Sequence, residues 1–131
     1  NQAYVGVDTG YEIQIDDEAR GNPGIGEADG FFYNRTGAIY KITQAGNAPG
    51  QQAYVQPPRL APETWHTYEI EVNGNTYVAR LDGVETTRFT RHPTETFRGN
   101  PPSVDPVSGY IGLQTHTGTV TFANVRLRAL P

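Results

Sequence analysis

The sequence contains no cysteine among its 131 residues. This absence excludes disulfide bonds, thiolate metal sites and cysteine nucleophiles. Lysine and arginine form no block, and the formal net charge is −4, so the sequence predicts neither a nucleic-acid partner nor binding to an anionic membrane surface. No apolar run approaches the roughly 20 residues needed to cross a bilayer, so no membrane span is predicted.

Helical patterns are also scarce. No long stretch is rich in Ala, Leu, Glu and Lys, and no segment keeps a helical period over about 11 residues. Glycine (15) and proline (10) are abundant instead. The length fits one domain over residues 1–131, and the composition predicts an all-β domain of short strands joined by turns.

The chain begins at Asn1 and shows neither an initiator methionine nor a signal peptide. We therefore expect a mature or excised segment of a longer protein. The absence of cysteine does not fix the compartment, although many bacterial secreted domains share it. We expect a secreted, periplasmic or cell-surface protein.

The clearest local pattern is an antiparallel meander. Residues 67–72 alternate, with Tyr68, Ile70 and Val72 on one face. Residues 76–81 and 84–90 continue the pattern after two turns whose residues tolerate positive φ, Asn73-Gly74-Asn75 and Asp82-Gly83.

Four further segments are predicted to be strands: Tyr11–Asp16, Ala38–Ile42, Tyr110–Thr115 and Val120–Leu127. A bulge at Ala123-Asn124 would turn the apolar residues of the last strand to one side. Surface loops are expected over residues 17–34, 44–63 and 91–108, which are rich in Gly, Pro and polar residues. The core is expected to include Ile13, Ile15, Ile111 and Leu113.

Several motifs occur in an order that resembles a known family. They are Gly10–Asp16, Arg35–Tyr40, Trp65–Ile70, Leu81–Val84, Gly109–His116 and Phe122–Arg126. Together they resemble the 3-keto-disaccharide hydrolase domain, often labelled glycoside hydrolase family 16-like, over nearly the whole chain. The resemblance implies a concanavalin-like jelly roll, an antiparallel β-sandwich, that takes carbohydrate as its partner and acts on 3-oxidised glucosides.

The chain departs from that family at three positions. His66 and Asp82 stand where the family usually has Asn, and Ala123 stands where it has Arg. The family domain also has several strands before its first motif, whereas only nine residues precede Gly10 here. We therefore expect residues 1–131 to be the C-terminal part of a larger domain. The missing strands would come from another segment of the protein, a neighbouring copy or a partner chain.

The carboxylates favour one kind of chemistry. Glu12 and Asp16 are four residues apart, which places them roughly 13 Å apart on a regular strand, whereas a retaining glycosidase needs about 5–5.5 Å. A 3-keto sugar needs only one base, because its carbonyl acidifies the C2 proton and the C1 substituent can leave by elimination before water adds. A divalent metal could polarise the ketone.

The candidate residues each have a functional and a structural interpretation. Glu12 and Gln14 are either catalytic or only the polar face of a strand, and His116 is either a proton shuttle or an edge residue. Arg35 either clamps substrate or pairs with a loop acid, and Trp65 either stacks on a sugar or plugs the sandwich end. We expect one concave surface to hold Glu12, Gln14, Gln114 and His116, with Arg35, Tyr40 and Trp65 contacting the substrate.

The acidic loop is a candidate metal site. Asp16 and Asp17, with Glu18 and Asp29 nearby, could hold a structural calcium, and His116 could ligate a catalytic metal. Asp16 alternatively caps the loop.

Two functions follow from these residues. The first is an enzyme that cleaves 3-keto-glycosides, or a glycosidase-like relative. The alternative is a non-catalytic carbohydrate-binding or structural module of a larger extracellular protein.

Overall fold

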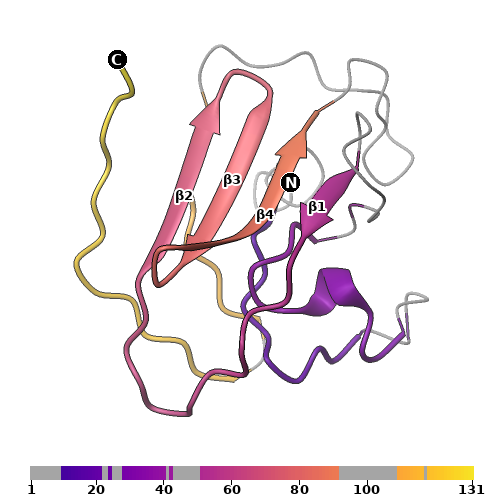
Figure 1. The fold of residues 1–131 in the computed structure, drawn as a ribbon. Coiled ribbons are helices and arrows are strands. Elements are labelled where there is room, and N and C mark those ends of the chain that lie inside the picture. Colours follow the sequence, from indigo (N-terminus) through magenta and orange to yellow (C-terminus); the bar gives the residue numbers. More distant parts are fainter. Residues whose placement is uncertain are drawn as a thin grey trace.

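A computed structural model of the protein describes residues 10–21, 24, 28–40, 42, 51–91, 109–116 and 118–131 (Figure 1). Regular structure in these residues consists of β-strands and a short 3-10 helix, η3 (Phe32–Asn34), so the predicted all-β class is confirmed. In the same residues we find no helix with the length and apolar character needed to cross a membrane.

Four antiparallel strands form one sheet in the order β1-β4-β3-β2. The predicted meander is confirmed, with bounds that agree to within one residue. Its second turn has φ of 50° at Asp82 and 81° at Gly83, the two positive values that a type I′ turn requires. The strands are β1 (Gln52–Tyr54), β2 (Tyr68–Asn73), β3 (Thr76–Leu81) and β4 (Val84–Thr90).

Strand β1 corrects the prediction that residues 44–63 form only a loop. Its anchor is the fully buried amide of Gln52. The Oε1 atom accepts hydrogen bonds from Ile39 N and Thr87 Oγ1, both at 2.9 Å, and Nε2 donates to the carbonyls of Ile39 (2.8 Å) and Ile42 (2.7 Å). A buried glutamine whose partners are all distant in sequence gives no local signal of a strand.

The predicted apolar face of β2 is only partly buried, because Tyr68 is half-buried but Ile70 is 42% and Val72 50% exposed. On the outer face Arg80 reaches Glu69 at 2.7 Å and Glu71 at 3.1 Å. The register shifts between Ala79 and Arg80, and this bulge lets the neighbouring Thr86 and Thr87 both be buried.

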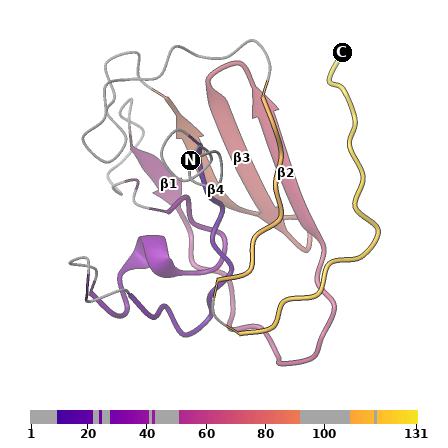
Figure 2. The same cartoon turned by 180° about the vertical axis from the view of Figure 1, so that it is seen from behind.

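A second layer covers the inner face of the sheet beside β4 (Figures 1 and 2). Residues 12–16 run antiparallel to residues 36–40, and we call this pairing the ladder. Its hydrogen bonds include Tyr40 N to Glu12 O (2.9 Å) and Gln14 N to Ala38 O (2.8 Å). The core forms between the two layers, from Ile39, Ile42 and Phe89 with Tyr11, Ile13 and Tyr77 packed against them.

The C-terminal part departs from the prediction. No strand is formed by the described residues of 109–131, and the two strands expected at 110–115 and 120–127 are therefore wrong. Ile111 is 79% exposed and Leu113 58%, so neither belongs to the core, and Ile15 is also 42% exposed.

The physical reason is that no strand of the described residues pairs with this segment. β2 is the last strand in the sheet order, and Figures 1 and 2 show residues 118–131 running alongside it, set apart from its edge. Asn124 has a φ of 53°, which is typical of bulges that contain a left-handed residue. It lies in no strand pair of the described residues, so the predicted bulge is not formed there. Most of the third predicted loop, residues 92–108, lies outside the described residues.

Candidate functional site

The ladder brings three predicted site residues together. Ile13 and Ile39 form its bridge and face the core, so the residues on either side of them face away from the sheet. Glu12 and Tyr40 are cross-strand neighbours on that outer face, where opposite Cβ atoms lie about 4.5–5.5 Å apart. Gln14 follows Glu12 on the same face, and all three side chains are half-buried. The outer face of the ladder is therefore the candidate site.

An aromatic surface adjoins this face. The Tyr33 ring contacts Tyr40 edge-to-face, with centroids 6.1 Å apart, and the Phe31 ring lies 4.3 Å from Tyr33. Phe31 remains 44% exposed. Such rings offer a stacking surface for the apolar face of a sugar. The sequence signal for it, three consecutive aromatic residues at 31–33, was missed.

Arg35 directly precedes residues 36–40 and so lies at one end of the ladder. Its Nη2 atom donates to the carbonyl of Gly30 at 3.3 Å, and no ion pair joins it to a loop acid among the described residues. The hydroxyl of nearby Tyr54 donates to Thr36 O at 3.1 Å. Burial raises the pKa of Tyr54 to about 12, although the charge of Arg35 opposes the shift. Tyr54 therefore stays a protonated donor at neutral pH.

Asp16 and Asp17 both accept hydrogen bonds that stabilise loops. The Asp16 carboxylate accepts hydrogen bonds from the backbone N–H groups of Glu18, Ala19 and Arg20 at 2.9–3.0 Å, so its predicted capping role is confirmed. Asp17 accepts from Thr36 Oγ1 and from Leu60 N, both at 2.6 Å. Among the described residues no three His, Cys, Asp or Glu side chains are grouped to hold a metal ion. A metal at Asp16, Asp17 or His116 stays a prediction.

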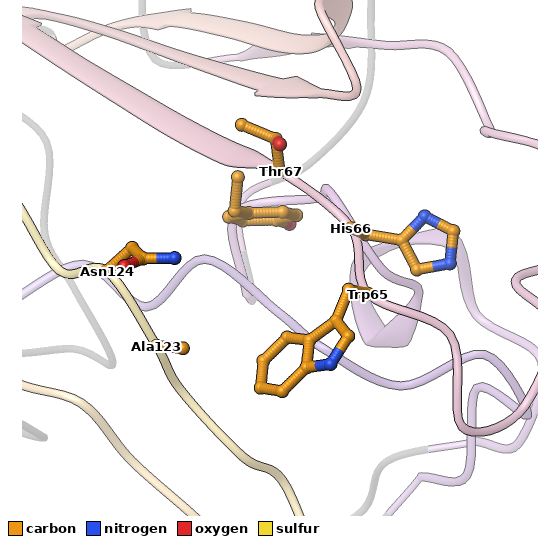
Figure 3. Close-up of a pocket in the computed structure, with 6 residues that line it drawn as sticks. Trp65, His66, Thr67, Ala123 and Asn124 are labelled. Atoms are coloured by element: carbon orange, nitrogen blue, oxygen red, sulfur yellow. The ribbon is translucent and has the colours of Figure 1, made fainter.

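Trp65 does not plug the sandwich, because it is 67% exposed, and that interpretation is wrong. It lines an open hollow of about 530 Å³ at the start of β2. In Figure 3 the side chain of Asn124 extends toward the segment that carries Trp65 and Thr67. The hollow's lining consists of Trp65, His66, Thr67, Tyr68, Ala123 and Asn124.

Two of the departures from the family contact each other. His66 Nδ1 lies 2.7 Å from Asp82 Oδ2. Asp82 Oδ1 also accepts from Thr67 N at 2.8 Å, and the hydrogen bond to His66, followed by this backbone bond, lowers the pKa of Asp82. The pair ties the start of β2 to the β3–β4 turn. Sequence reasoning missed it, because no motif links residues 16 positions apart.

Gln114 and His116 are not joined to the ladder by any hydrogen bond or ion pair between described residues. Both side chains are exposed on the extended segment 109–116. Figure 2 shows this segment crossing the same side of the sheet as the ladder, over β2 and β3. Their convergence with Glu12 and Gln14 stays a prediction.

Comparison with known proteins agrees with these motifs. The family model of the 3-keto-alpha-glucoside-1,2-lyase-like domain matches residues 1–128. The chain belongs to this family. No curated protein and no solved structure matches the chain. Membership in the family makes this a carbohydrate-active domain with a β-rich fold, and a sugar is therefore the ligand class against which the site is judged.

Proposed function

We propose that this domain cleaves the glycosidic bond of 3-oxidised glucosides by elimination, with Glu12 as the base. The family match supports the substrate class. The observation that carries the proposal is the outer face of the ladder, where a half-buried carboxylate stands beside Tyr40 and next to an aromatic surface.

The reaction needs few groups. Glu12 takes the C2 proton, and the electron pair left at C2 is delocalised into the C3 carbonyl as an enolate. The enolate then expels the C1 oxygen, which leaves as the alcohol after it takes up a proton, and a C1–C2 double bond remains. Addition of water, with hydroxide at C1 and a proton at C2, completes a net hydrolysis.

The ladder suits one base better than a carboxylate pair. Asp16 already accepts three backbone hydrogen bonds that cap its loop, so of the two carboxylates on residues 12–16 we assign the role of base to Glu12. Most glycosidases that act by direct displacement use two carboxyl groups on either side of the scissile bond. Tyr40, Gln14 and Arg35 would bind the hydroxyl groups and the ketone oxygen.

Turnover of matched sugars tests the proposal. The protein is incubated with 3-keto-trehalose, 3-keto-glucosides and unoxidised trehalose, each with EDTA or with added divalent metal. We expect cleavage of the oxidised sugars only. Glu12→Gln should lower the rate about 10²–10⁴-fold, the usual contribution of a general base. The control is Glu63→Gln, which neutralises an exposed loop carboxylate and should leave the rate unchanged. Equal rates for wild type and Glu12→Gln would remove Glu12 as the base.

A second candidate is a non-catalytic sugar-binding module. The exposed Phe31 ring favours it, because an aromatic surface binds sugar without any base. Calorimetry with 3-keto-trehalose separates the two functions: saturable binding without product in every metal condition would support the module and reject the enzyme.

A further inference from the structure

The hollow beside Trp65 lies outside the proposed catalytic site. None of its lining residues belongs to the ladder, and it is formed where the start of β2 faces Ala123 and Asn124 (Figure 3). We propose that this Trp65 hollow is a second carbohydrate site, which takes a neutral pyranose ring stacked on the indole.

The exposure of Trp65 is the first observation. An indole that is 67% exposed forgoes much of the free energy its burial would give, and its ring is accessible to a ligand. A flat indole beside hydrogen-bonding groups matches a pyranose, whose ring has an apolar C–H face and polar hydroxyls at its edge.

The lining chemistry selects a neutral ligand. Thr67 supplies a hydroxyl and Asn124 an amide, and the lining contains no Asp, Glu, Lys or Arg. The volume of about 530 Å³ falls in the range of small-molecule sites, roughly 300–1,000 Å³. A uronic acid would find no lysine or arginine there to pair with its carboxylate, so we expect the hollow to prefer neutral sugars.

Asn124 holds an uncommon backbone conformation at this place. Its φ of 53° lies in the left-handed region, which residues other than glycine adopt sparingly. Its amide points across the hollow toward the segment of Trp65 and Thr67 (Figure 3). Asn adopts this region more readily than most residues, and the conformation sets the direction of the Asn124 side chain.

The His66–Asp82 pair fixes the side of the hollow that lies opposite Asn124. Asp82 holds His66 Nδ1 at 2.7 Å and Thr67 N at 2.8 Å, and its own N–H donates to Thr67 O at 2.8 Å. The backbone on both sides of His66 is thereby fixed to the β3–β4 turn. Figure 3 shows the imidazole pointing away from Asn124, so His66 acts as a positioning residue and Trp65 presents the sugar-facing ring.

Trp65 is the single tryptophan of the chain, so its fluorescence reports on this hollow alone. The test is a titration of the protein with methyl glucoside, trehalose and cellobiose, and in parallel with glucuronate. We expect a saturable change in emission with the neutral sugars, and at least tenfold weaker binding of glucuronate. These sugars are not oxidised at C3, so the result does not depend on turnover.

Calorimetry on variants decides where the sugar sits. Trp65→Ala should weaken binding of the neutral sugars at least tenfold, and Asn124→Ala should weaken it less. Val55→Ala is the matched control, because Val55 is equally exposed at 66% and does not line the hollow. Absence of binding, binding that survives Trp65→Ala, or equal binding of glucuronate would each overturn the proposal. An inactive enzyme that still passes this test would reject only the lyase function.

Discussion

At the residue scale, Gly37 shows how closely the ladder packs on the sheet. It has a φ of 88°, and a Cβ atom added there would lie 2.7 Å from Thr86 Cβ and Oγ1. Thr86 Oγ1 also donates to Gly37 O at 3.1 Å. The glycine therefore serves two needs, a left-handed backbone and contact with a strand of the other layer.

We predict that Gly37→Ala destabilises this contact by about 1–3 kcal/mol, the usual cost of overpacking. Since 1.4 kcal/mol is a factor of ten, amide hydrogen exchange in β3 and β4 should speed up by roughly one to two decades. Gly83→Ala is the control, because its φ of 81° carries a similar backbone cost while nothing lies within 4 Å of the added Cβ. Equal effects of the two substitutions would show that the contact with Thr86 is unimportant.

The hydrogen bond between His66 and Asp82 leads to a second prediction at the residue scale. Its stabilisation requires ionised Asp82, whose folded pKa is depressed, so the stabilisation is present at neutral pH and is lost as pH falls through that lowered pKa. His66→Asn should raise the pKa of Asp82 toward its ordinary value, measured by carbon NMR of its carboxyl group. Part of the depression should remain, because Thr67 N still donates to Asp82. An unchanged pKa would contradict the assignment of His66 as the main cause.

At the scale of elements, the meander was predictable because its information is local. Alternation sets the faces of β2, and Asp82-Gly83 sets the turn that follows β3. Strand β1 was not predictable, because Gln52 is held by residues from the ladder and from β4. The same alternation at Ile111 and Leu113 gave a wrong prediction. An apolar pattern becomes a strand only where a neighbouring strand exists to pair with it.

The outer edge of β2 is one of the two edges of the described sheet. Ile70 is 42% exposed and Val72 50%, and β2 has a strand partner on one side only among the described residues. Such edges promote association between chains. We predict that the 131-residue chain self-associates in sedimentation velocity as its concentration rises.

A charge on this edge tests the prediction. Val72→Lys should reduce the association, whereas Val84→Lys adds the same charge at a residue 65% exposed beside the β3–β4 turn and should have little effect. A monomer at all concentrations, with a sharp thermal transition, would contradict association at this edge. It would also contradict the expectation that further strands are needed to complete the domain.

At the scale of the whole molecule, the arrangement of the candidate site was predictable from the sequence, whereas the hollow beside Trp65 was not. Glu12, Gln14 and Tyr40 could be predicted, because they belong to motifs whose strand pairing places them together. The hollow could not be predicted, because it joins Trp65 to Asn124, and only the folded chain brings these distant segments together.

The most direct test of the proposed elimination follows the C2 hydrogen during turnover in D₂O. Proton and deuterium NMR of the 3-keto-glucose released from 3-keto-trehalose measures it, with an enzyme-free sample as the control for spontaneous exchange. We predict that the product carries deuterium at C2, because Glu12 removes the original proton and solvent supplies its replacement, and that Glu12→Gln forms almost no product. A product that keeps its original C2 proton, formed faster than without enzyme, would mean direct displacement at C1 and would contradict the proposed mechanism.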